Sequence, residues 1–337
     1  MTEGILLAVT AGIMLGVYAL PEKFTKGFQY ENTWSLFFLL TMFVVPVIAS
    51  IVLIQGFGEI FSQMPMDLWI KMGLASFLWG IGVMMWSKAI NYIGLSLGFS
   101  IFIGTVIFIG SLLPFAVDGL PDNESLILIL TGILVVLLGV VLKGKAGLIR
   151  EKDEAALTKE STAGGMKGSM ATGILIAIVG GLLATGFSYA NAVGRPYLHE
   201  ASQAHGNADW VTAVAVMFPI FISGGIVMTA YFGYHLSKKK AWAAFKTPAF
   251  GKNFMLILFM AVFHYAASAL FAFAAFKLGE SGNTVGYAIY NTACVVTAIV
   301  SGIITKEWVS ASPKAKKLLY AGVACMVIGI VVIALGN

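Results

Sequence analysis

The sequence predicts an all-α integral membrane protein in which ten transmembrane helices form two inverted five-helix repeats. The chain has 337 residues, of which 59% are hydrophobic and only 11% are charged, and its mean hydropathy is +0.90. Soluble globular proteins carry roughly 25% charged residues, so this composition excludes an ordinary soluble domain. Two further observations, the length of the apolar segments and an ordered similarity between the halves, predict the number and arrangement of the helices.

Ten apolar segments are long enough to cross a bilayer, which takes about 20 mostly apolar residues. Only a turn at Gly94 separates the third segment from the fourth. The first segment follows Met1-Thr2-Glu3 and lacks the basic start and the small-residue cleavage site of a secretory signal, so we expect it to be retained as a helix. The expected spans are residues 4–21, 34–55, 69–92, 95–118, 125–143, 170–192, 210–235, 253–277, 283–305 and 317–335.

The chain divides into two similar halves. Residues 1–143 form the first expected repeat, residues 144–168 a polar cytoplasmic linker, and residues 169–337 the second repeat. Gly4–Ala8 in the first span recurs as Gly173–Ala177 in the sixth. A five-helix unit crosses the membrane an odd number of times, so its second copy must be upside down. Many secondary transporters use such inverted repeats to hold a substrate near the membrane midplane. Further matches in the same order are Gly12 with Gly181, Tyr18 with Phe187, and Pro46 with Pro219.

Lysine and arginine collect in the odd-numbered connections between the expected spans. Cytoplasmic loops carry an excess of these residues, so we expect the odd connections to be cytoplasmic and both termini to be extracytoplasmic. The net charge of +5 and the pI near 9.0 arise from these loops and do not indicate nucleic acid as a partner. The three richest connections hold Lys143, Lys145, Arg150, Lys152, Lys159 and Lys167 (fifth), Lys238, Lys239, Lys240, Lys246 and Lys252 (seventh), and Lys306, Lys314, Lys316 and Lys317 (ninth).

Polar side chains at membrane depth are costly and are therefore candidates for function. Aromatic rings stack on the C–H faces of a sugar while amides and hydroxyls bond its OH groups, so a pocket with both kinds of side chain suits a neutral polyhydroxylated ligand. Helix packing is the alternative, because Ser, Thr and Asn also form hydrogen bonds between helices. The substrate-binding candidates are Tyr18, Trp79, Ser100, Ser188, Asn191, Tyr265, Tyr287, Tyr290 and Asn291.

Three titratable residues are candidates for coupling transport to protons. His264 lies midway along the eighth expected span, and an unperturbed histidine titrates near pH 6.5; an interhelical hydrogen bond is the alternative. Glu22 follows Pro21 where the first span ends, and Glu200 follows His199 beyond the sixth. We expect these two carboxylates at opposite faces of the membrane. A solvated helix-end charge is the alternative for each of them.

The sequence carries no signature of an enzyme or of a metal site. Cys294 and Cys325 each lie within an apolar segment and belong to no CxxC pattern, so we expect reduced packing residues and no metal. No hydrolase or kinase motif is present, and the scattered glycines lack the strand and helix context of a dinucleotide site. The expected partners are a small-molecule sugar and membrane lipid. The proton is the coupling ion, no other cofactor is expected, and a monomer is compatible with the ten-helix unit.

A series of short motifs lies in register along most of the chain. These motifs are Tyr18-Ala19 with Pro21, Glu31 with Trp34-Ser35, Trp79-Gly80-Ile81-Gly82, Gly94-Leu95-Ser96-Leu97-Gly98, Phe187-Ser188, Asn191-Ala192, Pro196, His199-Glu200-Ala201, and Gly302 with Lys306-Glu307-Trp308. In order and spacing they resemble the L-rhamnose–proton symporters, a family within the drug/metabolite transporter superfamily of ten-helix carriers. The chain departs from that pattern at Ala269–Ala272, where the rhamnose carrier has larger aromatic and amide side chains, and at His264, Tyr287 and Tyr290.

The resemblance implies uptake of a deoxyhexose driven by the proton gradient across a bacterial inner membrane. It also implies a pocket walled by the first, third, fourth, sixth, eighth and ninth helices. The functional prediction is a secondary active transporter that takes up L-rhamnose or a related monosaccharide with a proton, by alternating access. The alternative is an exporter or exchanger of another small metabolite, such as an amino acid. A nucleotide-sugar cargo is disfavoured, because only Lys88, Arg195 and Lys277 supply cations near helix ends.

Overall fold

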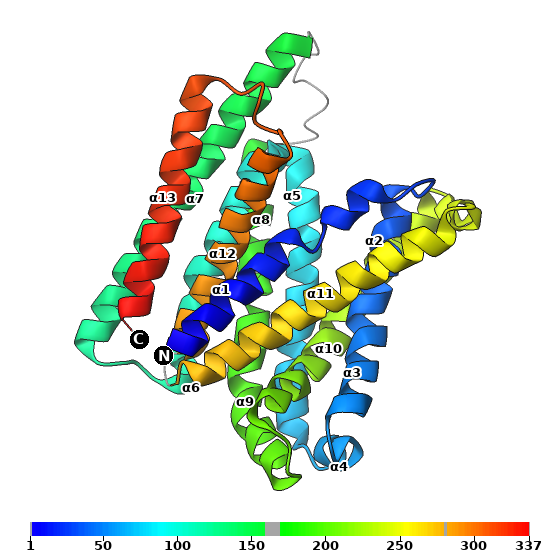
Figure 1. Ribbon diagram of the computed structural model, residues 1–337, viewed down its shortest axis with the longest axis vertical. Helices are drawn as coiled ribbons and strands as arrows, with labels where there is room; N and C mark the ends of the chain where they lie inside the picture. The colour runs from blue at the N-terminus through cyan, green and yellow to red at the C-terminus, as the bar shows by residue number, and fades with distance from the viewer. Residues whose placement is uncertain (1, 159–168, 280–281, 337) are drawn as a thin grey trace.

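A computed structural model describes residues 2–158, 169–279 and 282–336, and the regular elements in this part of the chain are helical (Figure 1). Nine helices of the described chain are long and apolar enough to cross a membrane, and Ser96–Leu112 is a shorter apolar helix. The predicted all-helical membrane protein is confirmed, while its division into inverted repeats stays a prediction. The elements are α1 (Thr2–Val17), η1 (Leu20–Phe24), α2 (Tyr30–Leu39), η2 (Leu40–Val44), α3 (Val45–Leu53), α4 (Phe57–Ser62), α5 (Met66–Leu112), α6 (Phe115–Asp118), α7 (Asn123–Thr158), α8 (Met170–Ala184), α9 (Gly186–Ala204), α10 (Asp209–Lys238), η3 (Ala241–Lys246), α11 (Phe250–Lys277), α12 (Gly282–Ile304) and α13 (Pro313–Leu335).

The chain reverses sharply within α5. Gly94 has φ 76° and ψ 167°, a conformation that residues with a Cβ rarely adopt. Beyond it the chain runs back along itself, since a Cβ added at Gly98 would lie 3.6 Å from the Cα of Ile90. The expected turn at Gly94 is therefore present, and it separates the span Met66–Gly94 from the helix Ser96–Leu112 (Figure 1).

Two helices continue well beyond their expected spans. α7 runs to Thr158 and not to residue 143, so residues 144–158 of the expected linker are helical, while residues 159–168 lie outside the described residues. α9 continues to Ala204, although the expected sixth span ended at residue 192. Both extensions are more polar than the spans they continue, as expected for helix ends that leave the hydrocarbon and project into water.

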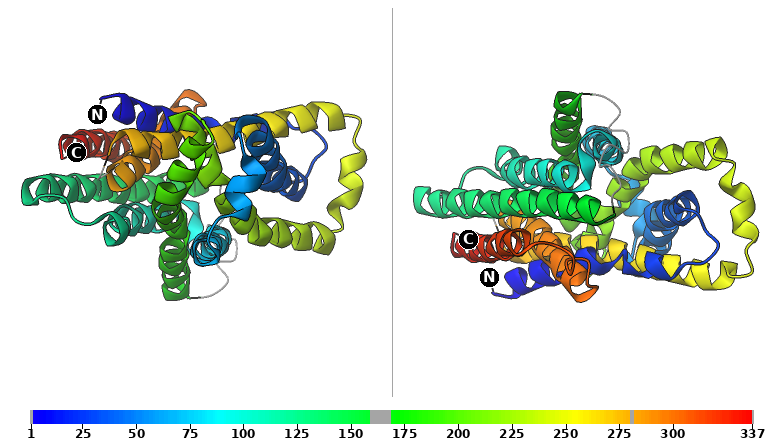
Figure 2. Two further views of the ribbon diagram at one scale, coloured as in Figure 1. Left: turned by 90° about the horizontal axis from the view of Figure 1, so that it is seen from below. Right: turned by 90° about the horizontal axis from the view of Figure 1, so that it is seen from above.

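The helices form a central group with a pair on either flank. α7 and α13 lie side by side, because Gly139 faces Gly322 and Gly132 faces Gly329 without intervening side chains. On the other flank, α10, η3 and α11 form an arc around α2 (Figure 2). α1, α5, α8, α9 and α12 lie between these flanks and carry most of the candidate functional residues, while His264 and Tyr265 lie on α11.

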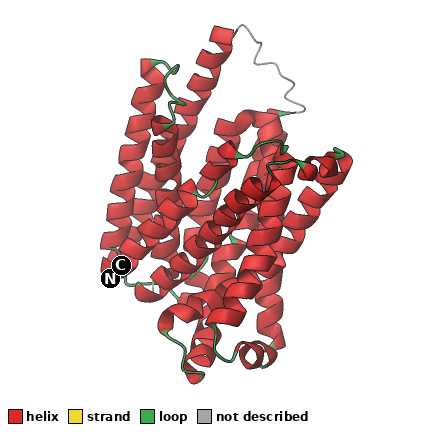
Figure 3. Ribbon diagram, turned by 45° about the vertical axis from the view of Figure 1, so that its right-hand side comes forward, coloured by secondary structure: helices red, strands yellow, loops and turns green. Residues whose placement is uncertain are grey.

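The bundle has two ends, which we name for their landmarks (Figure 1, Figure 3). The terminal end holds the start of α1, the end of α13, and the connections 54–65 and 205–208. The Gly94 end holds the Gly94 turn and the connections 25–29 and 305–312. α1 and α8 run in opposite directions between these ends (Figure 1). Loops join the helices at both ends, so the middle of the bundle is built from helical segments alone in the described chain (Figure 3).

Two local irregularities bring side chains together in the middle of the bundle. η2 is a π-helical turn that precedes Pro46, whose ring removes a helical N–H. In this turn Thr41 faces α11, where its Oγ1 donates to the carbonyl of Ala261 at 3.2 Å. α9 begins at Gly186, which lies so close to the carbonyl of Ala75 that a Cβ would not fit. The irregular turns therefore place α3 against α11 and α9 against α5.

Candidate functional site

Aromatic side chains from helices on all sides meet in the middle of the bundle. Trp79, halfway along its span, has its ring centroid 5.1 Å from that of Phe187 on α9 and 5.8 Å from that of Phe221 on α10. We call the whole group the central aromatic cluster. Its members are Tyr18, Phe37, Trp79, Phe187, Phe221, His264, Tyr265, Phe271, Tyr287 and Tyr290.

Phe271 of α11 connects the predicted tyrosines of α12 to this cluster. Its ring stacks on Tyr290 at 4.9 Å and meets Tyr287 edge-on at 5.6 Å. It also lies 5.8 Å from Phe187, which contacts Trp79. Stacked and edge-on arrangements are the favourable geometries of aromatic pairs. The structure therefore brings Trp79, Tyr287 and Tyr290 into one continuous group.

His264 and Tyr18 lie in the same cluster. The His264 ring is 4.8 Å from Tyr18 and 5.6 Å from Phe221. Its Nδ1 shares a hydrogen bond of 3.2 Å with Thr41 Oγ1 in the π-helical turn. The interhelical bond that was the alternative interpretation is therefore present, and a role for His264 in proton coupling stays a prediction.

The two predicted carboxylates have different surroundings. The indole N–H of Trp34 donates to Glu22 Oε1 at 2.8 Å. The Trp34 ring lies 5.2 Å from Phe37, which in turn lies 5.5 Å from His264. Glu22 is thus linked to the cluster from the Gly94 end. Glu200 is exposed on α9 and takes part in none of these contacts.

Three polar candidates are already hydrogen-bonded within the protein. Each donates to a main-chain carbonyl: Ser188 Oγ to Gly110 at 2.7 Å, Ser100 Oγ to Ser96 at 2.8 Å, and Asn291 Nδ2 to Tyr287 at 2.9 Å. Tyr265 similarly donates from its hydroxyl to the carbonyl of Val214 at 3.4 Å. The bonds of Ser188 and Tyr265 join two helices and match the packing interpretation. Those of Ser100 and Asn291 lie within one helix, four residues back along the chain, and each hydroxyl or amide keeps an acceptor.

Asn191 differs from the other polar candidates. Its Nδ2 donates to Asn283 Oδ1 at 2.7 Å, whereas its own Oδ1 is buried without a hydrogen-bond partner among the described residues. A buried amide oxygen without a partner is costly and calls for an explanation. Asn191 also lines a small cavity.

Cavities approach the cluster from both ends of the bundle. The α9 cavity, of about 380 Å³, opens toward the terminal end and is lined by Arg195, Pro196, His199, Phe276 and Gly279. The small cavity that reaches Asn191 shares Arg195 and Phe276 with it. The α12 cavity, of about 250 Å³, lies toward the Gly94 end, and its lining includes Ser96, Phe99, Lys143, Arg150, Glu307 and Trp308. None of these lining residues belongs to the central aromatic cluster.

Sequence reasoning treated Lys143 and Arg195 only as charges at helix ends. The structure places both in cavity walls. For Lys143, the sequence did contain an indication that the helix continues beyond it. The residues that follow, Gly-Lys-Ala-Gly-Leu-Ile, are largely apolar or small. The partner of Asn191, Asn283, was also missed, because it lies at the start of a span and 92 positions away.

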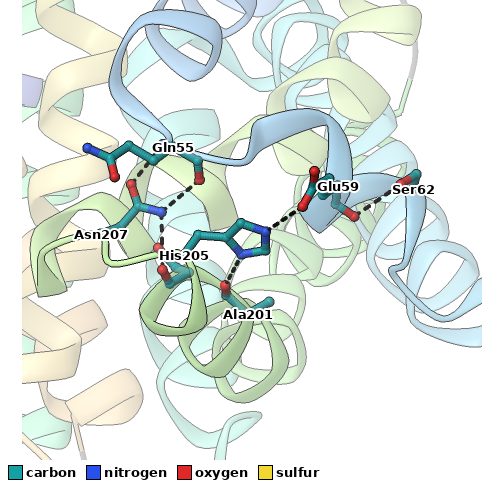
Figure 4. Close-up of polar contacts among 7 residues, drawn as sticks. Gln55, Glu59, Ser62, Ala201, His205 and Asn207 are labelled. Atoms are coloured by element: carbon teal, nitrogen blue, oxygen red, sulfur yellow. Dashed lines mark hydrogen bonds and ion pairs between the residues drawn. The ribbon is translucent and has the colours of Figure 1, made fainter.

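Two connections at the terminal end are joined by four residues that we call the terminal clasp: Gln55, Glu59, His205 and Asn207 (Figure 4). Asn207 Oδ1 accepts a hydrogen bond from the Gln55 N–H at 2.8 Å, and its Nδ2 donates to the Gln55 carbonyl at 2.9 Å. This pair of bonds joins the α3–α4 connection to the α9–α10 connection.

His205 adds a charged contact to the clasp. Its Nδ1 lies 2.9 Å from the Ala201 carbonyl and its Nε2 lies 3.1 Å from Glu59 Oε2 (Figure 4). Both neighbours are acceptors, so the protonated ring, which donates from both nitrogens, fits this geometry best. The bond to Ala201 and then the bond to Glu59 raise the pKa of His205 above its ordinary value.

The Gly94 end is held by carboxylates. Lys23 Nζ donates to Glu307 Oε1 at 2.9 Å, which joins the end of η1 to the α12–α13 connection. That hydrogen bond, as the largest cause, lowers the pKa of Glu307. Glu151 Oε1 accepts from both the N–H and the hydroxyl of Ser96, at 3.1 and 2.6 Å. An anion at this helix start satisfies a free N–H and complements the helix dipole.

Comparisons with known proteins match this chain over its full length. The family model described as L-rhamnose-proton symport protein matches residues 1–337. Proteins named L-rhamnose-proton symporter from Escherichia coli O1:K1 / APEC and from Citrobacter koseri are each 22% identical to this chain over 344 residues, covering 99% of it and 98% of their own length. A crystal structure with 14% sequence identity has a TM-score of 0.58 and covers 99% of this chain and 97% of that chain, which shows a similar fold.

Proposed function

The chain belongs to the L-rhamnose–proton symport family, and from this premise we propose that it takes up L-rhamnose or a related monosaccharide together with a proton. The family is one of transporters and not of enzymes. We further propose that the chain works in a bacterial inner membrane with both termini extracytoplasmic, and that two inverted repeats alternate access to one central site.

The arrangement of the cavities is the observation that supports this proposal most directly. A cavity lies toward each end of the bundle, and the linings of both leave out the residues of the central aromatic cluster. A carrier exposes its substrate site to one side at a time, with the site near the midplane. A packed layer between two opposed cavities suits that requirement. The opposite directions of α1 and α8 add support, since upside-down repeats need them (Figure 1).

We propose that the sugar binds where the cluster meets Asn191. Trp79, Tyr287 and Tyr290 supply flat aromatic surfaces, and an apolar wall with a few polar groups is the usual composition of such a site. A sugar hydroxyl that donates to Asn191 Oδ1 would give this buried oxygen the partner that it lacks. Binding would then open the cluster, because its rings are packed against each other in the present conformation.

We propose that His264 takes up the coupled proton. It lies in the same cluster as the sugar candidates, and Glu22 is linked to it from the Gly94 end through Trp34 and Phe37. The protonated ring donates from both nitrogens, while Thr41 bonds only Nδ1. Protonation therefore favours a conformation that supplies a second acceptor, and such a difference between states is what coupling requires.

Uptake of labelled L-rhamnose into proteoliposomes tests the proposal. With an inwardly directed proton gradient, the sugar should accumulate above its external concentration, and without the gradient it should only equilibrate. Accumulation that ignores the gradient contradicts symport, and no sugar uptake under either condition contradicts the cargo.

The variant His264→Gln tests the proton site. It should keep sugar exchange across the membrane and lose the gradient-driven accumulation. His235→Gln is the matched control, because His235 lies on α10 near the Gly94 end and its ring neighbours in the described part of the chain are Tyr231 and Tyr234. Full accumulation by His264→Gln would exclude His264 as the coupling residue.

A further inference from the structure

The α12 cavity contains a cation that no salt bridge neutralises. Lys143 of α7 lines this cavity, and its Nζ lies 4.3 Å from the centre of the Phe99 ring on α5. Among the described residues, no carboxylate lies within salt-bridge distance of this ammonium group. A charge held inside a transmembrane bundle is costly and marks a functional site unless it has a counter-ion.

The two acidic side chains around this cavity are engaged elsewhere. Glu307 accepts from Lys23 at 2.9 Å and from Thr305 at 3.0 Å. Glu151 receives both hydrogen bonds of Ser96. Each carboxylate therefore holds a loop or a helix start in place. Glu151 acts on Lys143 only through space, and among the described residues no carboxylate forms a direct ion pair with the Lys143 ammonium.

The rest of the cavity wall suits a small polar anion. Arg150 adds a second positive charge and lies 4.8 Å from the Trp308 ring. Ser96 also lines the cavity, with its hydroxyl donated to Glu151, and Val295 lines the deep side. Val295 lies one helical turn from Asn291 on the same face of α12. The cavity thus leads from the Gly94 end toward the predicted substrate residues of α12.

We propose that the α12 cavity binds the carboxylate of an acidic monosaccharide, a hexuronate, with Lys143 as its counter-ion. This inference rests on the proposed transport function and narrows its substrate class. The α12 cavity would hold the sugar on the Gly94 side of the cluster, before it reaches the site beside Asn191. A neutral sugar would leave the Lys143 ammonium without a direct ion-pair partner, whereas a carboxylate forms a charge-assisted hydrogen bond with it. The cavity volume of about 250 Å³ lies just below the roughly 300–1,000 Å³ of ligand sites and suits a single sugar ring.

Binding of D-glucuronate and D-glucose tests the inference, because the two sugars differ only in the carboxylate at C6. In calorimetric titrations of the purified full-length protein, glucuronate should bind about tenfold or more tightly than glucose. Equal affinities, or no binding of glucuronate, would overturn the inference. If L-rhamnose uptake persists in that case, only this inference fails; if glucuronate binds but no sugar is taken up, the proposed transport function fails instead.

Three variants assign the preference to Lys143. Lys143→Met should lose the preference for glucuronate and keep its affinity for glucose, while Lys143→Arg should keep most of the preference. Lys145→Met is the matched control, because Lys145 lies two residues away, is exposed and does not line the α12 cavity. A full preference in Lys143→Met would overturn the assignment. Thermal unfolding without ligand checks that each variant is folded, and Lys143→Gln replaces Lys143→Met if that protein is not.

Discussion

Different kinds of side chain hold the connections together at the two ends of the bundle. At the terminal end, an amide and an imidazole connect the α3–α4 and α9–α10 connections, through Asn207 with Gln55 and His205 with Glu59. At the Gly94 end, carboxylates make the connections, and Glu307 with Lys23 and Glu31 with Lys239 are ion pairs between segments far apart in the sequence. A carrier that opens one end at a time needs contacts at its two ends that can break separately. The contacts at these two ends are stable over different pH ranges.

The sign of each response follows from the direction of the pKa shift. The pKa of His205 is raised, so its stabilisation is complete below the unfolded value of roughly 6.5 and is lost as the pH rises through the folded pKa. The pKa of Glu307 is lowered, so its stabilisation is present above the unfolded value of roughly 4.3 and is lost as the pH falls through the folded pKa. Alkaline conditions therefore weaken the terminal clasp, and acidic conditions weaken the Gly94 end.

Removing the amide of the terminal clasp should have the largest effect on this comparison. Asn207 is 6% exposed and bonds both main-chain groups of Gln55. Asn207→Ala leaves those groups without their partner, which should cost roughly 1–3 kcal/mol of unfolding free energy. The midpoint of thermal unfolding in detergent should fall clearly. Asn123→Ala, at an exposed position on the same end, is the control; equal midpoints for both variants would show that the clasp does not hold this end.

A smaller, pH-dependent effect is expected from His205→Gln. The wild-type unfolding midpoint should decline between pH 6 and pH 8.5 by more than that of the variant, because only the wild type loses a protonated imidazole. Glu59→Gln should remove part of the decline, since the Ala201 carbonyl remains as the larger contributor. His235→Gln should follow the wild type. Parallel curves for the wild type and His205→Gln would rule out the clasp as the pH-sensitive end.

The smallest effect should come from the ion pair between Lys23 and Glu307 at the Gly94 end. The side chains of Lys23 and Glu307 are 51% and 46% exposed, so water and salt screen them, and such pairs contribute at most about 1 kcal/mol. Lys23→Met should lower the unfolding midpoint slightly at low salt and leave it unchanged in 1 M salt, where the screening length is about 3 Å. Lys26→Met is the control for loss of an exposed lysine nearby. A loss greater than that of Asn207→Ala would reverse the ranking of the two ends.

The candidate site shows where sequence reasoning succeeds and where it stops. Trp79, Tyr287 and Tyr290 were singled out as aromatic residues at membrane depth. Phe187 and Phe271 connect them in one cluster. Glu200 was singled out by its position beyond a span, and it is exposed on α9. Lys143 was counted as a loop charge, since the sequence does not reveal which side of α7 faces a cavity.

The sequence by itself determined the membrane-spanning class, the approximate position of each span, the turn at Gly94 and the family. These features depend on local composition, on the thickness of the bilayer, or on motifs in a fixed order. Only the tertiary structure decided which polar groups meet: Thr41 with His264, Gln55 with Asn207 and Asn191 with Asn283 are 223, 152 and 92 positions apart. These pairings depend on how each helix is rotated about its axis and packed against its neighbours. In a chain this apolar, many rotations of a helix satisfy the same hydrophobic pattern. The contacts within the assembled bundle therefore select one rotation for each helix.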